Sequence, residues 1–486
     1  MKKAFLVFSL CLVLALAGLT AGVVSLHDSR DDVEVILTTR AGDPIHAQGL
    51  TAWQTVRHAE HLFWDLAIPL DTPEETNTRY TFSARDMEWN SYTEDPLTLS
   101  THISSYHFLD GPNTTVTEKM VQYDPAFVPL LPLLNLMAEG TDPGQTSTET
   151  IHPGDYMDSF PYEVYCSLPD TLLRYDETLS ELTDQEQRIP RFFQEAFPLD
   201  FPEDEIWTVT VKKRNTGYLE EVSYDSGSTT GQLYLISTNS DQAVFLAIAQ
   251  DTWPAPDYSR FPQGNGVYRM EMTHEGEDES FLEVQTLTNI FPLPNEAMVL
   301  DLTLDGAGSL LVTWYDAGDY TCTILDEDTL EPLDTISLFH QERSEAEVIV
   351  YDGMTDQEYA YATWAYVELR AIPKENCILF LGLDHFWLFL PTEEGWQEQF
   401  SAPLTEEFWY ASDLRMDAAW NGEKLAMGSA DGWTSGLDLW VYAGTGDLLF
   451  QGHYDTSLTH HPDMEGYNYS SNVFPMEGKE LELHWK

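Results

Sequence analysis

Basic residues are scarce in this sequence of 486 residues. It contains 23 Lys and Arg against 82 Asp and Glu, which gives a formal net charge of −59. Proteins bind polyphosphates and anionic lipids mainly through Lys and Arg, so this balance excludes nucleic acid and anionic membrane surfaces as partners. Mutual repulsion of the carboxylates is expected to keep the chain soluble.

Cysteine is also scarce, with four residues in the whole chain. Cys11 lies in the first apolar segment, which leaves Cys166, Cys322 and Cys377. Such a small number excludes a disulfide framework, because proteins of that class use dense, even sets of cysteines. At most one bridge forms among the three, the pairing is open, and three buried thiols are an equal alternative.

Local catalytic signatures are missing. The sequence has no Gly-x-Ser-x-Gly nucleophile elbow and no glycine loop for phosphates or dinucleotides. Carboxylate pairs are too numerous to mark a glycosidase, which needs two at a defined separation. We therefore assign no catalytic residue and no cofactor, and we favour a protein that is not an enzyme.

Two histidine motifs are candidate metal sites. His58-Ala59-Glu60-His61 has a step of three, whereas zinc proteases need a step of four. His460-His461-Pro462-Asp463, with His453 and Asp455 nearby, contains adjacent histidines, which point to opposite faces of a strand. We assign no metal ligand in either motif and expect a polar turn at the first and a polar loop at the second.

Two acidic clusters, at 275–279 and 326–328, supply the oxygen ligands that calcium prefers. Neither has the alternating Asp, Asn and Gly spacing of a calcium loop. We expect solvated turns at both places.

The first segment carries a localisation signal. Lys2 and Lys3 precede an apolar run from Ala4 to Leu26, which reaches roughly 34 Å as a helix, enough for a hydrocarbon core of about 30 Å. We interpret residues 1–27 as a signal-anchor helix, with a signal peptide cleaved after Ala15-Leu16-Ala17 as the alternative. Both place the remaining chain outside the cytoplasm, because positive residues stay inside.

Apolar residues alternate with polar ones at period two in many segments. Clear examples are 33–38, 207–212, 437–442 and 481–486. This period is typical of strands with one buried face. The sequence therefore predicts an all-β fold.

Turn signals recur through the second half of the chain. Asn239, Asp305, Glu375 and Asn421 stand before apolar strands at intervals of roughly 46 to 70 residues. This spacing fits one four-stranded propeller blade per interval, which predicts seven or eight blades if residues 33–486 form one ring.

A ring of blades must join its first and last blades to avoid exposed strand edges. We therefore expect 33–38 and 481–485 to share one closing blade. The alternative division has an N-terminal β region at 33–165, an insertion or linker at 171–204, and propeller repeats at 205–486. The apolar stretch 128–137, with Pro129 and Pro132, predicts buried extended structure.

The last repeat is the clearest. Met416–Ala426 is followed by Leu437–Tyr442 and Gly444–Phe450, in the strand and turn rhythm of degenerate propeller repeats. The chain resembles the uncharacterised bacterial membrane-anchored extracytoplasmic β-propeller-like proteins. That resemblance implies a propeller tethered to the cell membrane and brings no activity with it.

Trp207, Trp440 and Trp485 stand in alternating strands. Their rings are expected to pack in the core or between sheets rather than to stack on sugars.

These observations lead to one functional hypothesis and two alternatives. We expect a non-enzymatic cell-surface module that binds a protein, a peptide or a glycan. We further expect a monomer that touches the membrane only through its N-terminal helix. The alternatives are an extracytoplasmic carboxylate-dependent glycan hydrolase, and an envelope sensor or assembly factor.

Overall fold

The computed structural model describes most of the chain after residue 32. The described ranges are 33–58, 62–82, 97–100, 106–108, 115–117, 127–159, 163–166, 201, 205–226, 232–240, 243–251, 263–275, 281–340, 369–382, 385–393, 395–404, 415–430, 436–460 and 477–486.

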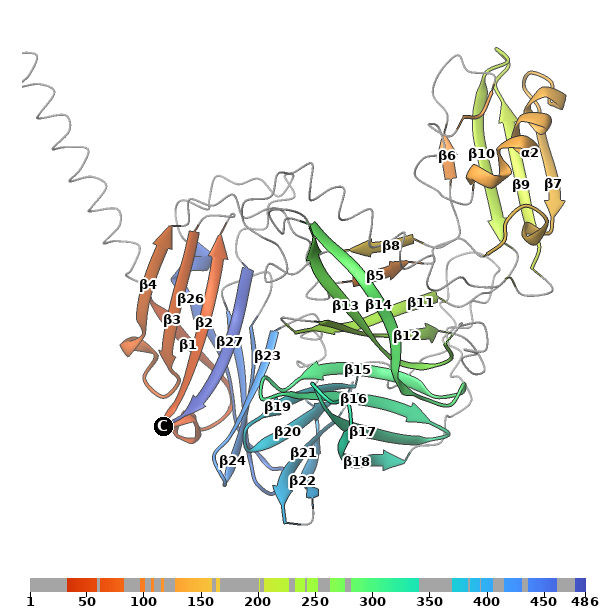
Figure 1. Cartoon of the computed structure of the whole chain (residues 1–486). Coiled ribbons are helices and arrows are strands. Elements are labelled where there is room, and N and C mark those ends of the chain that lie inside the picture. The colour runs from red at the N-terminus through yellow and green to blue at the C-terminus, as the bar shows by residue number, and fades with distance from the viewer. Residues whose placement is uncertain are drawn as a thin grey trace, which may run out of the picture. The chain divides into compact units, whose positions relative to one another are not determined.

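The described chain is mostly β-strand, arranged in several antiparallel sheets (Figure 1). This confirms the predicted predominance of β-structure. The chain divides into two compact units, which we call the split unit (residues 1–90 and 372–486) and the inserted unit (residues 91–371).

The split unit contains three sheets. The first has the order β1-β26-β25-β24-β23, the second β27-β2-β3-β4, and the third β19-β20-β21-β22. Their strands are β1 (Val35–Gly42), β2 (Leu50–His58), β3 (Leu62–Pro69), β4 (Asn77–Phe82), β19 (Arg370–Lys374), β20 (Cys377–Leu381), β21 (His385–Thr392), β22 (Gly395–Pro403), β23 (Arg415–Trp420), β24 (Lys424–Ala430), β25 (Leu437–Ala443), β26 (Leu448–Thr456) and β27 (Glu477–Trp485).

The prediction that both end segments share one blade was wrong. β1 pairs with β26 in one sheet, whereas β27 pairs with β2 in the next, with Leu50 opposite Trp485. The sequence shows that 33–38 and 481–485 are strands, but their period does not encode a partner. Each of these two sheets therefore joins a strand from the start of the described chain to strands from its end.

The predicted repeat turns are confirmed. Ser240, beside Asn239, closes the β11–β12 hairpin with Ala243, and Asp305 closes the β15–β16 hairpin with Ser309. Asn421 closes the β23–β24 hairpin with Lys424, and Glu375 follows the end of β19 directly. Each turn joins an edge strand of a four-stranded or five-stranded sheet to the strand next to it.

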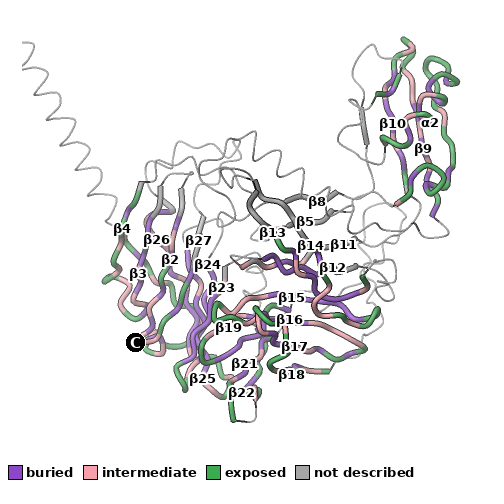
Figure 2. The backbone as a smooth tube through the Cα atoms, in the orientation of Figure 1, coloured by how far each residue is buried: buried purple, intermediate pink, exposed green. Residues whose placement is uncertain are grey.

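The core of the split unit lies between its sheets (Figure 2). β25 is buried on both faces: Leu439 packs in the cluster with β2 and β3, and Trp440 packs in the cluster with β20 and β21. The sequence predicted only one buried face for 437–442. A strand between two packed sheets buries both, and Trp440 and Tyr442 are apolar enough to do so.

The inserted unit contains sheets with the orders β11-β12-β13-β14, β15-β16-β17-β18, β6-β10-β9-β7 and β5-β8. Their strands are β5 (Leu97–Ser100), β6 (Tyr106–Phe108), β7 (Thr146–Ile151), β8 (Glu163–Cys166), β9 (Trp207–Lys213), β10 (Leu219–Ser226), β11 (Gln232–Asn239), β12 (Ala243–Asp251), β13 (Gly266–Glu275), β14 (Phe281–Pro292), β15 (Met298–Leu304), β16 (Ser309–Asp316), β17 (Asp319–Asp326) and β18 (Pro332–His340).

The stretch 128–137 was wrongly predicted as extended. It lies in the helix α2 (Phe127–Gly140), which packs on β9 and β7. Its buried residues follow helical spacing and are Leu130, Leu133, Leu134, Met137 and Ala138. Pro129 lies in the first turn, where its missing N–H costs nothing, and the packing tolerates Pro132.

The contacts divide the chain at boundaries other than 33–165 and 205–486. β7 pairs with β9, which joins residues on either side of 171–204, and β1 and β2 pair with strands of the last forty residues described. The segments 1–27 and 171–200 lie outside the described residues. Within the described part, no helix combines the length and hydrophobicity needed to span a bilayer.

Cys322 and Cys377 are free and buried thiols. Burial raises the pKa of Cys322 to about 12 and that of Cys377 to about 11. Neither forms a disulfide, so the open pairing resolves in favour of free thiols at these two positions.

Candidate functional site

An exposed tryptophan marks one face of the sheet β27-β2-β3-β4. Along β2, Ala52 and Val56 are buried against the rest of the split unit, whereas Trp53 points to the opposite face and is 53% exposed. Its direct neighbours across the strands are Glu482 and Ala67. We call this second face the Trp53 face.

The Trp53 face is otherwise polar. Thr55 donates a hydrogen bond to Asp65 at 3.2 Å, and Arg79 lies opposite Asp65 on β4. On β27, His484 Nε2 lies 3.1 Å from Glu482 Oε2. The face therefore presents both hydrogen-bond donors and acceptors around one aromatic ring.

A second candidate is a buried carboxylate where three sheets meet. Asp417 on β23 contacts Lys374 at the end of β19 through an ion pair and accepts a 2.6 Å hydrogen bond from the backbone N–H of Leu483 on β27. The indole of Trp485 donates to the carbonyl of Ala419 at 3.1 Å. Asp417 thus connects the edge strands β19, β23 and β27 of three sheets.

The environment of Asp417 decides its chemistry. Burial raises the pKa of its carboxyl, and the Lys374 ammonium and the donated hydrogen bonds oppose that shift. Both carboxylate oxygens of Asp417 already have partners, so we assign this side chain a structural role.

The sequence contained a signal for Asp417 that we missed. Asp301 stands four residues before the turn residue Asp305, as Asp417 stands four before Asn421, and a glycine follows each turn residue. Asp301 likewise accepts a backbone hydrogen bond, from Ala371 at 2.8 Å. An Asp at this spacing therefore accepts a backbone hydrogen bond from a strand of another sheet in both cases.

A third cluster lies on β1, β25 and β26. Asp438 Oδ1 lies 2.9 Å from His453 Nδ1 and 3.1 Å from Arg40 Nη1. The hydrogen bond to Asp438 raises the pKa of His453, and burial partly opposes it. Ser429 lies opposite Asp438 on the other side, so the carboxylate stands between serine and histidine. A hydrolytic triad needs histidine in the middle, so this order is not one.

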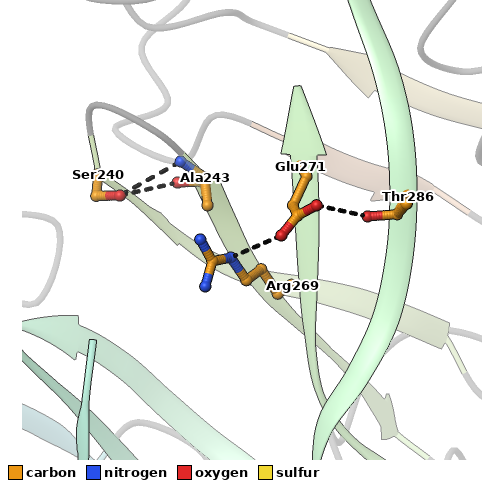
Figure 3. Close-up of polar contacts among 5 residues, drawn as sticks. All are labelled: Ser240, Ala243, Arg269, Glu271 and Thr286. Carbon is orange, nitrogen blue, oxygen red and sulfur yellow. Dashed lines mark hydrogen bonds and ion pairs between the residues drawn. The ribbon is translucent and has the colours of Figure 1, made fainter. Parts of the chain in front are cut away.

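A fourth cluster lies on the sheet β11-β12-β13-β14 (Figure 3). Arg269 Nε is 3.6 Å from one oxygen of Glu271, and Thr286 donates to the other at 3.1 Å. The Arg269 guanidinium carbon also lies 6.0 Å from the centre of the Phe245 ring. These contacts hold β12, β13 and β14 together and engage both oxygens of Glu271.

The predicted metal motifs are only partly within the described residues. His58 ends β2, whereas Glu60 and His61 lie outside the described residues. His460 ends the short helix η6 (Ser457–His460), and His461 and Asp463 lie outside the described residues. His453 pairs with Asp438, as described above. In the described ranges, no three His, Cys, Asp or Glu side chains converge to hold a metal ion.

The acidic clusters have a similar outcome. Asp326 accepts hydrogen bonds from the backbone and hydroxyl of Thr329 at 2.7 and 2.8 Å in the turn after β17, which confirms a turn there. Of the other cluster, residues 276–279 lie outside the described residues.

The core role predicted for three tryptophans is confirmed. Trp207 and Trp440 are fully buried, and Trp207 stacks on Tyr224 at 4.6 Å. Trp485 packs partly buried against the core of the split unit. Trp53 is exposed, in contrast to the other tryptophans that the structure describes, and no signal in the sequence distinguished it from them.

Comparison with known proteins identifies no family for this chain. No protein-family model matches the sequence, and no curated protein matches it. Among solved structures, puromycin hydrolase is similar with a TM-score of 0.25 and 10% identity, over 86% of this chain and 56% of that chain. This chain thus spans little more than half the length of that structure.

Two smaller structures are also similar. The Dos1 propeller has a TM-score of 0.24 and 8% identity, over 52% of this chain and 66% of that chain. Apo AztD from Citrobacter koseri has a TM-score of 0.21 and 8% identity, over 54% of this chain and 85% of that chain. Scores this low assign neither a fold family nor an activity.

Proposed function

We propose that the chain is a non-enzymatic binding module of propeller type, held outside the cytoplasm by its N-terminal segment, which binds a protein, peptide or glycan. The observation that carries the binding role is Trp53, a large aromatic side chain that is 53% exposed on a sheet whose opposite face is buried. Exposed aromatics of this kind are enriched at binding surfaces.

The location rests on the sequence. Lys2 and Lys3 followed by the run from Ala4 to Leu26 support a membrane anchor, and the acidic remainder supports a position away from anionic lipid. Proteolysis of intact cells tests this: external protease should remove the ectodomain while a cytoplasmic marker survives. Protection of the chain in intact cells would contradict the location.

The hydrolase alternative has no supporting feature in the described residues. It needs two free, converging carboxylates. Asp417, a carboxyl whose pKa is raised by burial, has both oxygens engaged by Lys374 and Leu483.

Photo-crosslinking in cells tests the binding role. A benzophenone amino acid replaces Trp53, and the matched control carries it at Tyr218, a 41% exposed aromatic of the inserted unit. We expect an adduct at position 53 that the control lacks. An equal pattern at both positions, or none, would mean that the Trp53 face is not where a ligand binds.

A further inference from the structure

The Trp53 face carries charges of both signs. Its register places the exposed carboxylates of Glu482 and Asp65 on the same face as the exposed guanidinium of Arg79. The backbone register also places Glu480 opposite Thr55. A ligand on this face therefore meets hydrogen-bond acceptors and a cationic donor together.

The ring of Trp53 is accessible from its own face. Its cross-strand neighbour on β3 is the small Ala67, and its same-face neighbours along β2 are Thr51 and Thr55. Trp53 makes no hydrogen bond within the described part of the chain, so its indole N–H is available to a ligand. The flat ring can thus receive a planar array of C–H groups while its edge donates a hydrogen bond.

The surrounding groups suit a ligand that both donates and accepts. Glu482 and Asp65 accept hydrogen bonds, Arg79 donates them, and His484 can do either. Sugar hydroxyls do both, and the C–H groups of a pyranose form a flat apolar patch of about the size of an indole ring. A basic peptide would use only the acceptors and would meet the cation of Arg79.

We infer that the Trp53 face binds a neutral oligosaccharide of pyranose units, with one ring stacked on Trp53 and its hydroxyls bonded to Glu482 and Asp65. This inference deepens the proposed function and depends on it. Binding is expected to change little with salt, because it does not arise from charge attraction.

Calorimetric titration of the full-length chain tests the inference. The probes are cellohexaose and chitohexaose as neutral sugars, a fully deacetylated chitosan hexamer as a cationic sugar, and a lysine-rich peptide. Trp53→Ala should weaken the binding of a neutral hexasaccharide about tenfold or more, whereas Trp53→Phe should retain most of it. Glu482→Gln should weaken it several-fold.

Two matched variants control for general effects. Tyr218→Ala removes another half-exposed aromatic, and Glu75→Gln removes an exposed charge from the turn between β3 and β4. Both should bind as the parent does. Thermal melts should agree among all variants, because the side chains involved are exposed.

The outcomes separate the inference from the proposed function. Peptide or cationic sugar binding that depends on Trp53, without neutral sugar binding, overturns the ligand class and leaves the binding role intact. Neutral sugar binding that survives Trp53→Ala overturns the site. If no probe binds, the inference fails, and the crosslinking at position 53 decides separately whether the proposed function fails with it.

Discussion

Asp417 Oδ2 accepts a hydrogen bond of 2.6 Å from the backbone N–H of Leu483 across the junction of two sheets. Replacing Asp417 with Ala leaves this buried N–H without an acceptor and Lys374 without its counter-ion. We expect a loss of about 3 kcal/mol in the free energy of unfolding, measured by urea denaturation.

A conservative variant and a control variant accompany Asp417→Ala. Asp417→Asn keeps an acceptor for Leu483 and should lose less, and Glu423→Ala, an exposed carboxylate in the next turn, should lose nothing measurable. Equal stability of Asp417→Ala and Glu423→Ala would show that the junction does not stabilise the split unit.

The pair formed by His453 and Asp438 predicts a pH dependence. The hydrogen bond to Asp438 raises the native pKa of His453 above its unfolded value. The protonated imidazole therefore stabilises the fold fully below its unfolded pKa of about 6.5, and this contribution is lost as pH rises through the native value.

His453→Gln should flatten the fall in stability over that window. A histidine NMR titration should give a native pKa above the ordinary value for the resonance missing in His453→Gln. The hypothesis fails if that resonance titrates at or below the ordinary value.

Cys322 and Cys377 should be unreactive in the folded protein. Their pKa values of about 12 and about 11 leave almost no thiolate at neutral pH, and both are fully buried. Mass mapping after maleimide treatment should find both unlabelled in native protein and labelled in urea. Native labelling at either position at the rate of a free thiol would contradict the burial.

Gly42 ends β1 where only glycine fits. Its φ is +71°, and a Cβ there would overlap the carbonyl oxygen of Leu449 on β26. Gly42→Ala should therefore destabilise by about 3 kcal/mol, with part of the cost from the left-handed backbone. Gly49 has a similar φ of +81° but open space around it, so Gly49→Ala should cost only about 1 kcal/mol. Thermal melts of the two variants check the difference, and equal losses would exclude the steric part.

The local pattern of the sequence predicted strands and hairpin turns well, because period two and turn chemistry act over a few residues. The turns at Asp305 and Asn421 are examples. Pairing between distant strands has no such local code, so the partners of β1 and β27 were misjudged. The helix at Leu130–Ala138 was missed because two prolines outweighed a clear helical spacing of buried residues.

The candidate site was hidden for a different reason. Trp53 and Trp207 both stand in strands that alternate, and only the packing of each sheet decides which face is covered. By contrast, Asp417 could have been found, since Asp301 stands at the same distance from its own turn.

The pairing of β2 with β27 sets an order on biogenesis. Leu50 can pair with Trp485 only after the end of the chain has been synthesised. Likewise, the backbone N–H of Glu34 donates a hydrogen bond to Ser457 Oγ, which lies 423 positions later in the sequence. Until the strand at 477–485 has been made, β2 offers an open edge to any neighbouring chain. The split unit can therefore complete its sheets only after synthesis has delivered that strand, and a chaperone that covers open strand edges would protect the chain in the interval.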